Sequence, residues 1–368
     1  MKLLSRKKLI SWLDNNLLLF LSAFLIAFIP LWPKIPLFSP IEQYIVRVRL
    51  EDVLVAFAGI IWLIQVFRKK IAWRSIYFYL VIAYATIGLL SVLGGVFVIN
   101  TIPLEPLHLG KSLLHYFRYL EYFSLFFILY SSIKSAKDVK KLLFISGLTV
   151  VAITIYGYGQ KYLYWPVYST MNREFSKGVR LYLTEHARVQ STFAGHYDLG
   201  AYLVILLPLL LSLFIYSKKI IARVFFFICF ILGLWLLVTS ASRTPFASYL
   251  VGITVVMGLF ALKKPSWTQK IIFQLKYAGI FYAITLIMMI FFGQDMNERF
   301  LQVLDGYPKI SKTYHQLNHQ RKIVSKNIIT SIFGKDQKFI IEVEKPEGAI
   351  AFDNNNVLTP TDQLPTPQ

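Results

Sequence analysis

Long apolar runs recur along the chain and are separated by short polar segments. A helix needs about 20 mostly apolar residues to cross the hydrocarbon core of a bilayer. Runs that approach this length cover residues 16–33, 50–67, 75–99, 113–133, 142–160, 195–216, 224–240, 245–262 and 272–293. The pattern predicts an all-α, polytopic membrane helix bundle with about nine transmembrane helices. It also divides the chain into a transmembrane domain, 1–293, and a tail, 294–368.

The composition agrees with this class. The 368 residues are 56% hydrophobic and 16% charged, whereas about a quarter of an average soluble domain is charged. The formal net charge of +20 would suit nucleic acid, but the basic residues form short clusters between apolar runs, as in multispanning membrane proteins. We therefore expect membrane lipids as partners and exclude nucleic acid. The single cysteine, Cys229, lies inside an apolar run, which excludes a disulfide framework and a thiolate metal site.

The basic residues also predict an orientation. With the N-terminus in the cytoplasm, the inner polar segments carry 19 Lys and Arg, and the outer segments before the tail carry 11. Positive charge is retained on the cytoplasmic side, so this orientation is favoured. Nine crossings then place the tail outside the cytoplasm. Its end, VLTPTDQLPTPQ, has a composition typical of disorder.

Arginine is enriched on the predicted outer side. Of the 19 inner basic residues 15 are Lys, whereas the 11 outer ones include seven Arg: Arg47, Arg49, Arg118, Arg173, Arg180, Arg188 and Arg243. A planar guanidinium offers paired donors to phosphate oxygens that an ammonium group cannot match. One interpretation is an anionic, phosphorylated ligand on the outer side. The other is that these side chains reach lipid headgroups or pair with acidic residues such as Glu51, Asp52 and Glu121.

Ionisable residues gather at the mouths of two predicted spans. In KSLLHYFRYLEY, residues 111–122, Arg118 lies one turn from Glu121, which indicates either a wet cavity or a surface ion pair. The stretch 182–202 brings together Glu185, His186, Arg188, His196 and Asp198. Because polar groups at the head of a span must be satisfied, we expect His196 and Asp198 to lie in a cavity or a buried network.

The short outer turn TSASRTP, residues 239–245, is a third candidate segment. Pro245 suits the first turn of a helix, where its missing N–H costs nothing. The free backbone N–H groups of that helix start, with Arg243 and the neighbouring hydroxyls, form a candidate anion site. The alternative interpretation of this segment is a tight turn from which Arg243 extends to the lipid headgroups.

Two of these segments together carry a resemblance to a known family. Arg188 in RVQSTFAGHYDLGAYL, followed one span later by LLVTSASRTPFASYLVG, resembles the bacterial O-antigen ligase and polysaccharide polymerase family. In that family an Arg-x-x-(Ser/Thr)-Thr-Phe segment opens one span and a Thr-x-Ser-Arg turn opens another. The segments RVRLEDVLVAF and FRYLEYFSLFF are also similar to it, so the likeness covers roughly residues 40 to 262.

The resemblance implies a metal-independent membrane glycosyltransferase without a cofactor. Such an enzyme works on the outer face of the bacterial cytoplasmic (inner) membrane. It transfers a glycan from an undecaprenyl diphosphate carrier to an acceptor hydroxyl on a lipid, another glycan or a protein. The positions that match the diphosphate-binding residues are Arg188 and Arg243, with Arg118 as a weaker match.

The general base is the least defined part of this prediction. The family uses a His in a large outer loop after the Thr-x-Ser-Arg span, and TYHQLNHQRK in the tail does not match that segment. We therefore expect the tail to be the start of a larger outer loop in a C-terminally truncated chain. The candidate catalytic residues within the chain are His196, Asp198, His315 and His319.

Two other functions remain open. Outer arginines and a Gly-x-Gly in mid-membrane, Gly157 and Gly159, would also serve a transporter of an anionic lipid or sugar. Transporters tend to contain internal repeats with interrupted helices in corresponding halves, and the sequence contains no such repeat. The third possibility is a non-catalytic truncated remnant.

Overall fold

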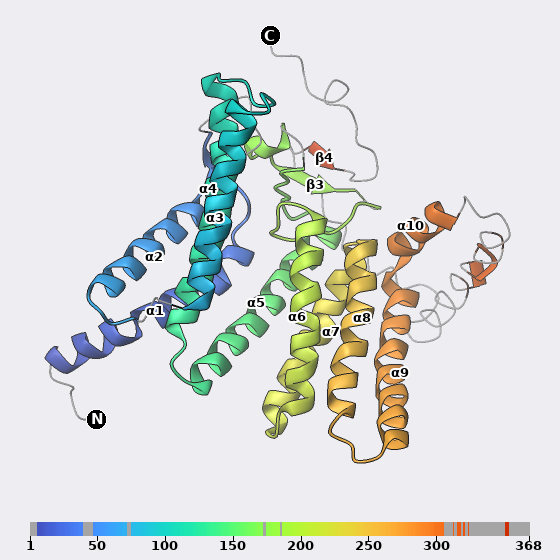
Figure 1. Cartoon of the computed structure of the whole chain (residues 1–368). Coiled ribbons are helices and arrows are strands. Elements are labelled where there is room, and N and C mark those ends of the chain that lie inside the picture. Colours follow the sequence, from blue (N-terminus) through green and yellow to red (C-terminus); the bar gives the residue numbers. More distant parts are fainter. Residues whose placement is uncertain are drawn as a thin grey trace, which may run out of the picture. The chain divides into compact units, whose positions relative to one another are not determined.

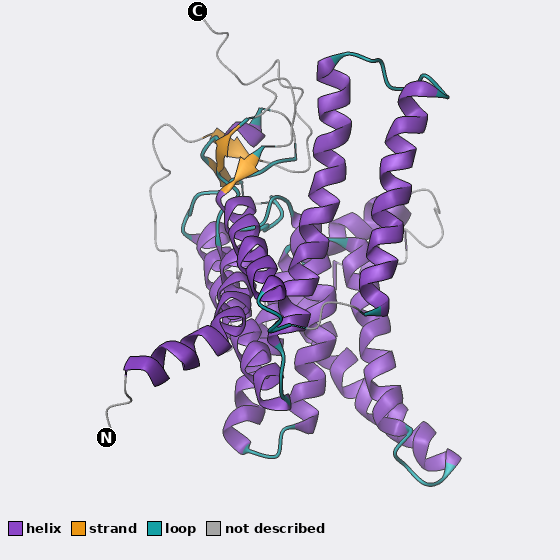
Figure 2. Ribbon diagram, turned by 60° about the vertical axis from the view of Figure 1, so that its left-hand side comes forward, coloured by secondary structure: helices purple, strands orange, loops and turns teal. Residues whose placement is uncertain are grey.

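Helices make up nearly all the regular structure of the chain (Figures 1 and 2). The computed structural model describes residues 6–39, 47–71, 75–171, 174–184, 186–304, 312, 315–317, 319–320, 323 and 350–352. The helices are α1 (Arg6–Leu31), α2 (Leu50–Phe67), α3 (Ile76–Phe97), α4 (Pro106–Ser132), α5 (Ala136–Tyr162), α6 (His196–Tyr216), α7 (Ile220–Thr239), α8 (Arg243–Ala261), α9 (Trp267–Phe292) and α10 (Gln294–Leu304). Each predicted apolar run overlaps one of the helices α1 to α9.

The strands are short. They are β1 (Pro36–Phe38), β2 (Val48–Arg49), β3 (Leu181–Leu183) and β4 (Ile350–Phe352), and a 3₁₀ turn covers Phe175–Lys177. β1 pairs with β2 in an antiparallel arrangement, and β3 pairs with β4 in a parallel one. Each pair is a separate two-stranded sheet.

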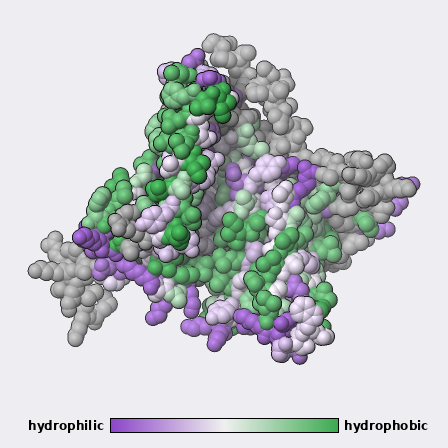
Figure 3. All heavy atoms as spheres, viewed as in Figure 1, coloured by the Kyte–Doolittle hydropathy of each residue, from purple (hydrophilic) through white to green (hydrophobic). Residues whose placement is uncertain are grey.

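The long helices have the length and surface of membrane spans. Within the described residues, eight of them are long and apolar enough to cross a membrane: α1, α2, α3, α5, α6, α7, α8 and α9. Large hydrophobic side chains are exposed along them, for example Leu80, Leu90 and Phe97 of α3, and hydrophobic residues cover much of the visible helix surface (Figure 3). The polytopic helical class is therefore confirmed, and such side chains are suited to contact lipid tails.

α4 coincides with the fourth predicted span but is not among those eight helices. Arg118 Nη1 lies 2.7 Å from Asp52 Oδ1 in the first turn of α2, and Trp62 Nε1 donates to Ser131 Oγ at 2.9 Å near the other end. α4 thus runs parallel to α2. The 13 residues between the two α4 contacts correspond to about 20 Å of helix.

The chain forms two compact units, and the boundary falls within α5. The N-terminal unit contains residues 1–149 and 175–178, and the C-terminal unit contains residues 150–174 and 179–368. In the N-terminal unit, α1, α2 and α4 pack against one another and α3 packs on α4. Leu25, Val55, Ala58 and Ile128 form the core between them.

Ion pairs hold both ends of the helices in the N-terminal unit. Just beyond α1, Lys34 Nζ lies 2.7 Å from Glu51 Oε2, and both side chains are buried. Burial lowers the pKa of Lys34 from its ordinary value, although the charge of Glu51 opposes this effect. At the opposite end of α1, Arg68 donates to both carboxylate oxygens of Asp14 at 2.8 Å.

In the C-terminal unit, α6, α7, α8 and α9 form a bundle of neighbouring helices (Figure 1). Its core includes Leu207, Leu211, Phe230 and Tyr249, which are fully buried or nearly so. The first residues of the predicted tail are helical: α10 packs against the ends of α7, α8 and α9. This bundle positions the segments that the sequence analysis singled out.

Candidate functional site

The loop that leads into α6 is fixed to the neighbouring helices by buried hydrogen bonds. Gln160 Nε2 of α5 donates to the carbonyl of Ser191 at 2.8 Å, and Ser191 Oγ donates to the carbonyl of Ile153 at 2.7 Å. The amide of Val189 donates to the carbonyl of Thr239 at the end of α7, at 3.2 Å. Because buried polar groups are costly unless paired, these bonds define the path of the loop around Arg188.

Arg188 contacts His196, the first residue of α6. Nη1 of Arg188 lies 2.5 Å from Nε2 of His196, and the His196 side chain is buried, with 1% of the residue exposed. A guanidinium has only donors, so Nε2 of His196 is the acceptor in this contact. The His196 ring also contacts that of Tyr197, with ring centroids 4.0 Å apart and the two planes tilted by 41°. The predicted buried network at the head of this span is confirmed for His196.

The turn between α7 and α8 lies against the same helix start. Ser240, Ala241 and Ser242 are buried, and Ser242 Oγ donates to the carbonyl of His196 at 3.1 Å. A Cβ atom on Gly200 would lie 2.6 Å from the ring of Pro245, so α6 and α8 approach closely here and glycine is required. The segments around Arg188 and Arg243 are therefore in contact.

α8 begins at Arg243, with Ser242 as the preceding N-cap residue and Pro245 in the first turn. This confirms the helix start predicted from TSASRTP. Arg243 is exposed at the positive end of the helix dipole. We refer to Arg188, His196, Ser242 and Arg243 as the arginine cluster, which combines guanidinium donors and the N-terminal amides of a helix, the groups that bind phosphate oxygens.

Three other predicted residues have different surroundings. Asp198 was expected in a cavity or a buried network, but it is exposed in the first turn of α6, where its negative charge interacts favourably with the helix dipole. His315 and His319 are exposed helical residues, and several of the residues around them lie outside the described part of the chain, as do Glu185 and Arg173.

Arg118 belongs to the N-terminal unit. It lies 2.7 Å from Asp52 Oδ1, donates to the carbonyl of Arg47 at 3.2 Å and lies 3.9 Å from Glu121 Oε2. The predicted Arg118–Glu121 pair therefore exists, but the shorter contact is with Asp52 of another helix. These partners make Arg118 part of the packing between α2 and α4.

The two glycines that would suit a transporter have packing roles. A Cβ atom on Gly157 would lie 2.6 Å from the side chain of Leu236, and one on Gly159 would overlap the ring of Trp165. α5 continues as an α-helix through both positions. Close approach of side chains thus accounts for both glycines.

The geometry defines a polytopic helical membrane protein with an arginine cluster at one end of the α6–α8 bundle. Comparisons of this chain with protein-family models, curated proteins and solved structures give no match.

Proposed function

We propose that the chain is a membrane glycosyltransferase of the O-antigen ligase or polysaccharide polymerase type. In this proposal it transfers a glycan from an undecaprenyl diphosphate carrier to an acceptor hydroxyl on the outer face of the bacterial cytoplasmic membrane. The observation that carries it is the contact between Arg188, His196 and Ser242, which joins the two segments that resemble the family.

The arginine cluster suits the departure of a diphosphate. Breaking the bond between an anomeric carbon and a diphosphate leaves negative charge on the leaving oxygen, and fixed donors in a poorly hydrated site stabilise that charge. The buried His196 holds the guanidinium of Arg188 in one orientation. Arg243 and the first amides of α8 add further donors from the adjoining turn.

The acceptor hydroxyl needs a base, for which His is the usual choice. Since Nε2 of His196 is engaged with Arg188, we assign His196 to positioning this side chain. Asp198, His315 and His319, all exposed, are then the remaining candidate bases among the residues named above.

Lipid binding by the purified chain tests this proposal. Each charge-assisted hydrogen bond contributes about 1.5–3 kcal/mol, so the cluster should bind undecaprenyl diphosphate more tightly than the monophosphate. Arg188→Ala should weaken diphosphate binding roughly tenfold or more. Arg180→Ala, an exposed arginine of the same loop, is the matched control and should bind as the unmodified chain does. Equal affinity for both lipids, unchanged by Arg188→Ala, would contradict the proposal.

A further inference from the structure

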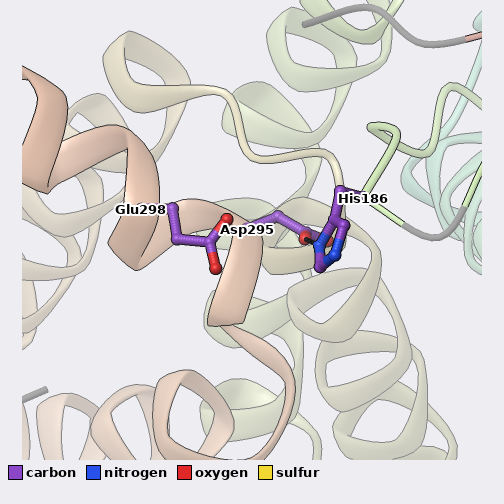
Figure 4. Close-up of side chains that lie close together, drawn as sticks. All are labelled: His186, Asp295 and Glu298. Atoms are coloured by element: carbon purple, nitrogen blue, oxygen red, sulfur yellow. Dashed lines mark ion pairs between the residues drawn. The ribbon is translucent and has the colours of Figure 1, made fainter. Parts of the chain in front are cut away.

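A second group of ionisable side chains lies close to the arginine cluster in sequence but uses other residues. His186 precedes Arg188 by two positions, and Asp295 and Glu298 lie in the first turns of α10 (Figure 4). One ligand atom from each of the three side chains lies within 4.8 Å of the others. Asp295 and Glu298 are three residues apart on a helix, so their carboxylates share one face.

What distinguishes this group from an ordinary ion pair is its third ligand, and its spacing is short enough for one shared cation. His186 Nδ1 lies 3.6 Å from Asp295 Oδ1, which is longer than the 2.7–3.2 Å expected of a hydrogen bond. Two ligands on a tetrahedral ion, each about 2.1 Å from it, lie about 3.4 Å apart. The observed distance is close to that value.

Asp295 is held in place by a second contact. Only 6% of the residue is exposed, and its Oδ2 accepts a hydrogen bond from Lys161 Nζ of α5 at 2.7 Å. The bond from Lys161 uses Oδ2, while Oδ1 is the oxygen nearer His186. Carboxylates that bind metals are typically oriented by such a second partner. Two carboxylates and one ammonium leave a formal charge of −1, which still attracts a divalent cation.

We propose that His186, Asp295 and Glu298 bind a divalent transition-metal ion, with Zn²⁺ as the best match. One imidazole nitrogen and two carboxylate oxygens suit Zn²⁺, whereas Mg²⁺ and Ca²⁺ favour oxygen ligands alone. The ion ties the loop before Arg188 to α10. It therefore orders the arginine cluster without taking part in glycan transfer.

Metal titration of the full chain tests this site. The protein, purified in detergent without a polyhistidine tag and treated with a chelator, is titrated with Zn²⁺ in competition with a fluorescent chelator. We expect one Zn²⁺ per chain and much weaker binding of Mg²⁺ and Ca²⁺. His186→Ala should weaken Zn²⁺ binding roughly tenfold or more. Removing a residue that only orients a metal ligand already lowers metal affinity about tenfold or more, and removing the ligand itself should lower it at least as much.

A matched control is available on α4. His108 Nε2 also lies 3.6 Å from a carboxylate oxygen, that of Glu105, but among the residues that the structure describes this is a pair and not a group of three. His108→Ala should leave Zn²⁺ binding unchanged. If His108→Ala and His186→Ala weaken binding equally, the metal binds non-specifically and the proposal is wrong.

A substitution that retains a ligand guards against loss of the fold. Cysteine binds Zn²⁺ and Co²⁺ through its thiolate, so His186→Cys should keep metal affinity and add a thiolate-to-cobalt absorption band when Co²⁺ is bound. Absence of stoichiometric metal from the unmodified chain, or absence of that band from a folded variant, would overturn the site. The titrations need no glycan donor, so their result is independent of the proposed glycosyl transfer.

Discussion

Nη1 of Arg188 lies 2.5 Å from Nε2 of His196, and the imidazole can only accept in this contact. The acceptor nitrogen of His196 is therefore used to hold the guanidinium of Arg188. It does not serve to take a proton from a substrate. The relationship separates a positioning role from a catalytic one, and it can be tested by choosing replacements that keep or remove the acceptor.

Replacing His196 tests the positioning role. His196→Gln keeps an acceptor oxygen and should retain undecaprenyl diphosphate binding within a few fold. His196→Leu removes the acceptor, leaves Arg188 without this partner, and should weaken binding by roughly tenfold, as expected for one charge-assisted bond. Isothermal titration with the purified variants measures the difference. Equal loss in both variants would show that the ring packing on Tyr197 matters and the acceptor does not.

The geometry of Arg188 itself predicts that charge alone is not enough. A lysine cannot provide the planar pair of donors that a guanidinium offers to phosphate oxygens. Arg188→Lys should therefore resemble Arg188→Ala in diphosphate affinity while it inserts into membranes normally. If Lys restores most of the affinity, the site needs only a point charge, and the argument from arginine enrichment fails.

The bond from Ser242 to His196 should contribute to stability. Ser242 is fully buried, and its Oγ lies 3.1 Å from the His196 carbonyl. Ser242→Ala should lower the free energy of unfolding by about 1 kcal/mol, the usual contribution of such a bond. Thr244→Ala, at an exposed position of the same turn, should have little effect. Thermal unfolding in detergent compares the two variants, and equal shifts would argue against the contact.

The apolar pattern was sufficient to predict the helices, because a bilayer requires long uninterrupted apolar segments. It could not predict α10, an 11-residue helix that follows the last apolar run and depends on packing against other helices. The contact between Arg188 and His196 follows partly from their nearness in the chain. The sequence placed Asp52 and Glu121 among the expected partners of the outer arginines, and both contact Arg118. It could not say which contact is the shorter one, because Asp52 lies 66 residues away and only folding brings it close.

The same limit applies to the metal-ligand group. His186 was visible among the polar residues before α6, but its neighbours Asp295 and Glu298 lie more than a hundred residues later. Their i, i+3 spacing was the only local signal, and it is common on exposed helices. Only the packing of α10 against the bundle brings these two carboxylates close to His186.

The buried pair of Lys34 and Glu51 predicts a large effect of removing one partner. Lys34→Met leaves the Glu51 carboxylate with Arg49 Nη1 at 3.2 Å as its remaining ion-pair partner among the contacts described here. Breaking a buried pair typically costs about 3–5 kcal/mol, and the arginine should place this variant near the lower end. The double variant Lys34→Met, Glu51→Leu should recover much of the loss. Chemical unfolding of the unmodified chain, Lys34→Met, Glu51→Leu and the double variant measures this, and an additive double variant would contradict the pairing.

The position of α4 predicts on which side of the membrane the tail lies. α4 lacks the apolar character of the other eight helices, yet its contacts at Arg118 and Ser131 follow α2 from Asp52 to Trp62. A helix that accompanies a membrane span over this length crosses the same bilayer, so we expect nine crossings and an extracytoplasmic tail. Alkaline phosphatase, which is active only outside the cytoplasm, should be active when fused after residue 304.

Two further fusions isolate α4 itself. Phosphatase fused within residues 101–105, before α4, should be active, and phosphatase fused at residues 134–135, after it, should be inactive. If α4 lay along the membrane instead, both of these fusions would report the same side, and the fusion after residue 304 would be inactive. That outcome would place the start of α8 on the cytoplasmic side, and the arginine cluster with it. The proposed use of an outer-face carrier would then be wrong.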